Sequence, residues 1–187
     1  MRRVVLIMTA SIDGYVAGPS GNAVGEHSEP AELKRWKLER IRRAGTHIMG
    51  RVTYEGMASI WPTSTDDYAA PMNEIPKVVF SKSLQKATWP ESSIARGNLA
   101  DEIAVLRRQP GGDIIAWGGA RFAQALSSAG LIDEYAIVTR PIAYGGGKPL
   151  FHALPDSLPF TVLASINYAD GTALHLYEQG SAESSQR

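Results

Sequence analysis

Two short stretches each place glycine directly after an apolar run that is typical of a buried strand. They are IMGRVTYEGM (48–57) and IIAWGGARFAQAL (114–126). Where a helix begins after a strand, its first N–H groups are unpaired and its dipole is positive, so a phosphate can bind there and glycine lets it approach closely. Arg51 and Thr53 would add a guanidinium and a hydroxyl at the first junction. Because ligands of open α/β sheets bind outside the carboxyl ends of the strands, the pair predicts an anion site.

Each junction taken alone is also compatible with a tight turn or a helix cap, because glycine commonly serves in turns. Neither stretch matches G-x-G-x-x-G or G-x-x-x-x-G-K-[ST], which excludes an ordinary Rossmann domain and a P-loop nucleotide triphosphatase. The run YGGGKPLF (144–151) could form a further anion loop through Lys148. We favour a turn that brings residues 149–151 onto the sheet.

The composition indicates a globular chain without a general affinity for polyanions. With 187 residues, 44% of them hydrophobic, the chain can bury an ordinary core, and we expect one domain over residues 1–180. The polar residues 181–187 are expected to form a disordered tail. The formal net charge is zero, with 19 basic and 19 acidic residues, so we expect neither nucleic acid nor anionic lipid as a partner.

Cysteine is absent, which excludes disulfides and thiolate metal sites and fits a reducing compartment such as the cytoplasm. The four histidines show no ligand spacing, so we expect no metal site. No apolar stretch approaches the roughly 20 residues that a membrane span needs.

Runs that are typical of strands alternate with helical stretches. Strands are expected at 3–9, 46–50, 77–81, 113–117, 134–140, 160–168 and 173–179, and helices within 30–45, 99–109 and 120–130. Only ADGT (169–172) separates the last two strands, which predicts an antiparallel hairpin. The alternation therefore predicts an α/β fold with a mixed, mostly parallel sheet, helices on both faces and a C-terminal antiparallel hairpin.

The order and spacing of several motifs resemble the dihydrofolate reductase superfamily, and in particular stand-alone relatives of the reductase domain of bacterial riboflavin biosynthesis. The motifs are TASIDGYVAG (9–18), IMGRVTYEGM, KVVFSKSL (77–84), IIAWGGARFAQAL and RPIAYGGGKPLF (140–151). The resemblance runs from Val4 to about Glu178. It implies an NADPH-dependent reductase of a small pteridine, dihydrofolate-like or pyrimidine substrate, in a family whose members often form homodimers. The alternative is an NADPH-binding module or sensor without turnover, because every strong motif concerns the cofactor.

The resemblance also implies which residues bind NADPH. Arg51 would lie near the 2′-phosphate, with Ser81 and Lys82 completing that site, and Thr53 would lie at the pyrophosphate. The other implied cofactor residues are Thr9, Ala10, Val16, Gly50, Trp117, Gly118, Gly119, Ala120, Arg121 and Phe122. The family often makes the Gly-Gly bond cis, and the loop from Ser11 to about Pro30 would cover the nicotinamide as a mobile lid.

Two acids are candidates for supplying the proton, with water as the alternative. Glu32, in PAEL, takes the place of the acid that helps to protonate the pterin in folate reductases, and half-burial would raise its pKa. The helix dipole alone also favours Glu in a first turn. Asp13 is the second candidate and a substrate contact, with an Asp-Gly turn as the alternative. Trp36 and Trp117 could contact the substrate, although a core position is equally compatible with Trp117.

Two further patterns of riboflavin biosynthesis are missing from the sequence. We find no basic pattern after the third strand that would grip a ribityl phosphate, and no zinc deaminase signature of H-x-E with P-C-x-x-C. Both absences weaken the interpretation as a riboflavin pathway enzyme.

Overall fold

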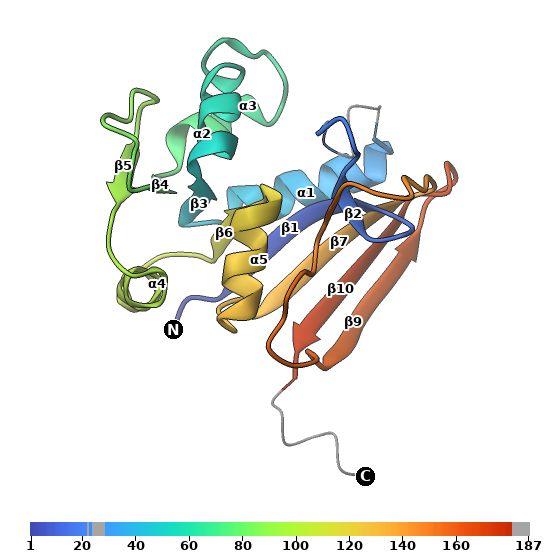
Figure 1. The fold of residues 1–187 in the computed structure, drawn as a ribbon. Helices are drawn as coiled ribbons and strands as arrows, with labels where there is room; N and C mark the ends of the chain where they lie inside the picture. The colour runs from blue at the N-terminus through green and yellow to red at the C-terminus, as the bar shows by residue number, and fades with distance from the viewer. Residues whose placement is uncertain (22, 24–28, 181–187) are drawn as a thin grey trace.

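In the computed structural model, which describes residues 1–21, 23 and 29–180, an eight-stranded sheet has the order β5-β4-β3-β6-β1-β7-β10-β9 (Figure 1). The strands are β1 (Val4–Ser11), β3 (Thr46–Gly50), β4 (Lys77–Phe80), β5 (Ser92–Ala95), β6 (Ile114–Trp117), β7 (Glu134–Arg140), β9 (Phe160–Asn167) and β10 (Ala173–Gln179). Every pair from β5 to β7 is parallel, and β10 runs antiparallel to both β7 and β9. The prediction of a mostly parallel sheet that ends in an antiparallel hairpin is confirmed.

Helices cover both faces of this sheet, as predicted (Figure 1). They are α1 (Ala31–Arg42), α2 (Arg51–Ala58), α3 (Ala69–Glu74), α4 (Leu99–Arg108) and α5 (Ala120–Ser128), with a 3-10 turn η1 (Trp61–Thr63). Successive residues of β1 point to opposite faces. Val5 and Ile7 therefore pack with Leu33 of α1, whereas Leu6 and Met8 pack in the cluster that includes α4 and α5.

A second, two-stranded sheet pairs β2 (Tyr15–Ala17) with β8 (Lys148–Pro149) in antiparallel register. The carbonyl of Pro149 also accepts a hydrogen bond of 2.8 Å from the Gln124 side chain of α5. The first part of the expected lid is therefore strand β2, joined to the glycine-rich loop. Residues 22 and 24–28 of the expected lid and the expected tail 181–187 lie outside the described residues.

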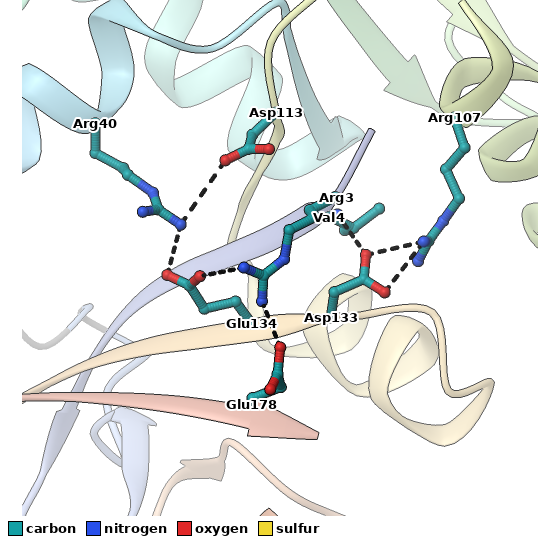
Figure 2. Close-up of polar contacts among 8 residues, drawn as sticks. All are labelled: Arg3, Val4, Arg40, Arg107, Asp113, Asp133, Glu134 and Glu178. Atoms are coloured by element: carbon teal, nitrogen blue, oxygen red, sulfur yellow. Dashed lines mark hydrogen bonds and ion pairs between the residues drawn. The ribbon is translucent and has the colours of Figure 1, made fainter. Parts of the chain in front are cut away.

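Ion pairs join the amino ends of the central strands, at the end of the sheet opposite the carboxyl ends of these strands (Figure 2). Glu134, at the start of β7, is almost fully buried and accepts Arg40 at 2.6 Å and Arg3 at 3.4 Å. Asp133 accepts the Val4 N–H at 2.7 Å and the guanidinium of Arg107 at 2.9 Å. These contacts hold β1 and β7 against α1 and α4 at the amino ends of the strands. None of the helices described in the chain has the length and apolar character that crossing a membrane requires.

Candidate cofactor and substrate clefts

The two glycine junctions lie side by side because β3 pairs with β6. Gly50 and Gly119 are the N-cap residues of α2 and α5, in extended backbone, and neither helix has a side-chain cap. The first N–H groups of both helices are therefore left to a ligand or to water. The Thr53 hydroxyl donates a hydrogen bond of 2.9 Å to the Gly118 carbonyl, which joins the two junctions directly.

A cavity of about 610 Å³ lies over these junctions, and we call it the junction cleft. Its lining residues are Gly50, Arg51, Val52, Thr53, Phe80, Ser81, Ser83, Gly119, Ala120, Arg121, Phe122, Ala125 and Lys148. Arg51, Arg121 and Lys148 contribute positive charge, and no carboxylate is among the lining residues that the structure describes. Arg51 does pair with Glu55 at 3.5 Å, but both side chains are about half exposed, so this pair is weak. The cleft is therefore suited to a ligand with several negative charges.

An adjoining hollow of about 350 Å³ extends the junction cleft past β4. Phe80, Ser81 and Phe122 line both, and the rings of Phe80 and Phe122 lie 5.2 Å apart. Lys82 lines this hollow together with Arg96 and does not line the junction cleft. The Ser81 hydroxyl accepts the N–H groups of Ser83 and Leu84, so it also shapes the loop after the strand. The rings of Phe80 and Phe122 thus form an apolar surface beside the cations Lys82 and Arg96.

Phe80, Arg96 and Lys148 line these spaces but are absent from the predicted cofactor set. Phe80 could have been found, because it ends β4 in register with Gly50 of β3. The sequence indicates an anion loop through Lys148 only as an alternative to a turn, whereas the structure places Lys148 both in β8 and at the cleft. Arg96 directly follows β5, a strand that the sequence pattern does not predict.

Two of the glycines at these junctions have close side-chain neighbours. A Cβ atom on Gly119 would lie 2.8 Å from the Thr53 hydroxyl oxygen, and one on Gly118 would collide with the side chain of Met8. The expected cis Gly-Gly bond is wrong, because no peptide bond among the described residues is cis. The trans form presents the Gly118 carbonyl to Thr53 instead.

A second cavity of about 430 Å³ opens at the carboxyl ends of β1 and β7, and we call it the α1 cleft. It is lined by Thr9, Glu29, Leu33, Lys34, Lys37, Asp66, Val138 and Arg140. Ile7 of β1 pairs with Trp117 of β6, so Thr9 lies two residues further along, at the level of Gly119. The α1 cleft therefore lies at the same end of the sheet as the second glycine junction.

Ion pairs and hydrogen bonds fill the wall of the α1 cleft. Lys37 contacts the Glu29 carboxylate at 2.7 Å, and the Tyr68 hydroxyl donates to the same carboxylate at 2.7 Å. Lys34 contacts Asp66 at 3.0 Å and Asp67 at 3.1 Å. Burial raises the pKa of Tyr68, and its hydrogen bond to Glu29 and the nearby carboxylate charges raise it further. This tyrosine therefore stays protonated as a donor.

Glu32 does not line the α1 cleft, and its expected half-burial is wrong because the side chain is exposed. Leu33, Lys34 and Lys37 lie on the face of α1 that borders the cleft, and each residue of a helix turns by about 100° from the last, so Glu32 falls outside that face. The carboxylate in the cleft wall is that of Glu29. Burial raises the pKa of Tyr168, and the charges of Glu32 and Glu29 raise it further.

Asp13 lines neither cleft. Its exposed carboxylate accepts the Gly145 N–H at 2.7 Å, the Tyr144 N–H at 3.1 Å and the Ser11 hydroxyl. The bond from Ser11, followed by that from Gly145, lowers the pKa of Asp13. Asp13 is therefore held ionised and fixes the glycine-rich loop, a position that does not favour proton donation.

The remaining candidates pack in or near the core. The Trp117 indole donates to Nδ1 of the buried His47 at 3.1 Å, and Trp36 packs against the apolar cluster beneath α1. Val16 is buried in β2, and Ala10 faces an apolar hollow on the opposite side of the sheet. In the described part of the chain, no group of three or more metal-ligating side chains could hold an ion.

Comparisons with known proteins agree with this geometry. The sequence model of the RibD C-terminal domain matches residues 2–174. A solved structure from Shewanella sp. PV-4, whose name assigns it to riboflavin biosynthesis, is 26% identical with a TM-score of 0.79, covering 96% of this chain and 99% of that one. Dihydrofolate reductase from Enterococcus faecalis, solved with NADP(H), is 16% identical with a TM-score of 0.65, covering 96% and 97%.

A longer protein from Thermotoga maritima has the same fold over part of its length. It is a diaminohydroxyphosphoribosylaminopyrimidine deaminase/5-amino-6-(5-phosphoribosylamino)uracil reductase, 13% identical with a TM-score of 0.70. The match covers 96% of this chain and 57% of that one. The last two likenesses show the fold, which is that of heterocycle reductases.

Proposed function

The chain belongs to the RibD C-terminal domain family, and we propose that it is an NADPH-dependent reductase of a small heterocyclic substrate. The observation that carries the proposal is the junction cleft, where three cations and no described carboxylate surround two uncapped helix starts. Such a cleft fits a dinucleotide that bears a pyrophosphate and a further phosphate. The α1 cleft, at the same end of the sheet, supplies space for a second, smaller molecule.

Residues of the junction cleft and of the adjoining hollow would hold the cofactor by charge and by shape. The N–H groups at the starts of α2 and α5 would bind the pyrophosphate, and Arg51, Ser81 and Lys82 would bind the 2′-phosphate. Phe80 and Phe122 offer an apolar surface for the adenine. The bound nicotinamide would supply a hydride to the substrate. Because Glu32 and Asp13 line neither cleft, we assign the proton to water that enters the α1 cleft.

Replacing Arg51 by alanine tests the cofactor assignment. We expect Arg51→Ala to weaken NADPH binding about ten- to a hundredfold, the range for losing a charge-assisted hydrogen bond, and to change NADH binding by less than about twofold. The dissociation constants are measured by fluorescence titration. Arg35→Ala, at an exposed arginine of α1 that lines neither cleft, is the matched control. Equal losses for NADPH and NADH would remove the 2′-phosphate role.

Turnover separates a reductase from a binding module. The absorbance of reduced nicotinamide is followed with dihydrofolate, pterins and ribitylaminopyrimidines as candidate substrates. Oxidation of NADPH with any of them supports the proposal. Saturable NADPH binding without oxidation across the whole panel would instead favour an NADPH-binding module or sensor.

A further inference from the structure

The two clefts differ in how their cations are compensated. In the junction cleft, Arg51, Arg121 and Lys148 line a wall in which no described residue is acidic. In the α1 cleft, Lys34, Lys37 and Arg140 line a wall that also contains Glu29 and Asp66. The two cavities therefore present different potentials to their ligands.

Each cation of the α1 cleft has a carboxylate partner. Lys34 pairs with Asp66 and Asp67, Lys37 pairs with Glu29, and Arg140 contacts Asp170 at 3.4 Å and the Thr172 hydroxyl at 3.0 Å. Three cations thus face four carboxylates. The Lys37 and Glu29 side chains are only 17% and 22% exposed, so water screens this pair less than an ordinary surface pair.

A phosphorylated substrate would have to break these pairs. A dianion that bound Lys34 or Lys37 would leave the carboxylate partners of that lysine unpaired beside its own charge. Like charges repel strongly in such a partly buried wall. The raised pKa of Tyr68, to which the charges of Glu29, Asp66 and Asp67 contribute after burial, is consistent with a negative potential there. An uncharged heterocycle can instead hydrogen-bond to carboxylates and ammonium groups that remain paired.

We propose that the α1 cleft selects a heterocyclic substrate that carries no phosphate or other anionic group, because Glu29, Asp66, Asp67 and Asp170 neutralise its lining cations. This inference rests on the proposed function, since it assigns the substrate to the α1 cleft. It separates the chain from the Thermotoga maritima reductase, whose name specifies a phosphoribosylaminouracil.

The test measures binding of a phosphate probe with the junction cleft filled. Wild-type protein saturated with NADPH is titrated calorimetrically with ribose 5-phosphate, and so is the Asp66→Asn, Asp67→Asn double variant. Asparagine at position 66 keeps the oxygen that accepts the Tyr68 N–H, so the loop retains this bond. We expect no saturable binding to the wild type. The double variant should bind saturably, with a dissociation constant at least tenfold below the highest concentration at which the wild type shows no binding.

Two further variants locate the effect. Adding Lys34→Ala to the double variant should abolish the gained binding, and Glu39→Gln, at an exposed position of α1 outside both clefts, should gain none. If the double variant does not fold, Glu29→Gln, which frees Lys37 while keeping an acceptor for Tyr68, takes its place. Saturable wild-type binding that Lys34→Ala removes would overturn the inference. Absence of binding to every variant would overturn it too, because the carboxylates would then not be the selective element.

The titration with NADPH is carried out first on the same samples. Failure to bind NADPH would contradict the proposed function alone. Ribose 5-phosphate titrated without nucleotide, with Lys34→Ala to locate the binding, would still test the charge selectivity of the α1 cleft.

Discussion

His47 is the residue that links Trp117, next to the second glycine junction, to the core. It is fully buried in β3. Because an indole N–H can only donate, Nδ1 of His47 must accept the bond from Trp117, and the ring proton lies on Nε2, which faces the Pro71 carbonyl at 3.4 Å. Protonation of Nδ1 would break the bond to Trp117. Burial, followed by the charge of Lys77, lowers the pKa of His47 to about 4.

This lowered pKa predicts a loss of stability in mild acid. The unfolded chain binds the proton with a pKa of about 6.5, whereas the folded protein binds it only near the value of about 4. The stabilising contribution is therefore complete above about pH 6.5 and is lost as the pH falls toward 4, by up to about 3 kcal/mol. Urea unfolding is measured at several pH values between about 7 and 4.5. The free energy of unfolding should fall less steeply with falling pH for His47→Gln than for the wild type. His152→Gln, at an exposed histidine, is the control, and equal slopes in all three proteins would contradict the prediction.

Residue types next to strand ends were predictable from the sequence, but residues placed by distant partners were not. Gly50 ends a strand and Arg51 and Thr53 follow it, so their placement at one end of the sheet follows from local pattern. Glu29 was missed because its position in the cleft wall depends on Tyr68, 39 residues away. Glu32 was chosen for its neighbours in sequence, and the rotation of α1 turns it outside the cleft face.

The strap formed by β2 and β8 is the element that places Lys148 at the junction cleft. Gly147 has φ of +125°, and a Cβ atom there would lie 2.1 Å from the Ala17 carbonyl oxygen. Such a contact with backbone forces one strand of the strap away from the other. On the opposite side, Gln124 holds Pro149 to α5.

Gly147→Ala should therefore separate the strap and weaken cofactor binding. We expect the dissociation constant for NADPH to rise about fivefold or more as Lys148 moves, with a stability loss of about 1–3 kcal/mol from the strained backbone. Titration and thermal unfolding measure the two effects. Gly145→Ala is the matched control, because its φ of +67° is also positive but no atom lies within 4 Å of the added carbon. Equal NADPH affinities for the two variants would refute the role of the strap.

At the scale of elements, strands of four or more residues with an apolar run were predictable, whereas polar strands and those of two or three residues were not. The expected strands at 46–50, 134–140 and 173–179 agree with β3, β7 and β10. Strand β5 was missed because SSIA has little apolar pattern of its own and is a strand through its pairing with β4. Strands β2 and β8 were missed because each has three residues or fewer and exists only through the other.

The two edges of the large sheet differ across the whole molecule. Strand β5 is a four-residue edge, whereas β9 is an eight-residue edge that contains no charged residue (Figure 1). Val162, Leu163 and Ile166 of β9 are exposed by 59%, 47% and 39%. A long, uncharged edge strand usually pairs with another strand or is protected by charge, proline or a bulge. In the part of the chain that the structure describes, no further strand pairs with the outer side of β9, and its irregularity is a single bulge at Leu163, where the register with β10 shifts.

We therefore expect two copies of the chain to pair through β9, because antiparallel strands related by a two-fold axis satisfy one another's N–H and C=O groups. Light scattering coupled to gel filtration should give twice the chain mass for the wild type at about 100 µM. The Val162→Lys, Ile166→Lys variant should give the mass of one chain, because the added charges repel across the axis.

Val105→Lys, at an exposed valine of α4, should stay dimeric. Since β9 contributes no residue to either cleft, the single-chain variant should keep wild-type NADPH affinity. A monomeric wild type, or a dimer that survives both β9 substitutions, would show that this edge is not the interface.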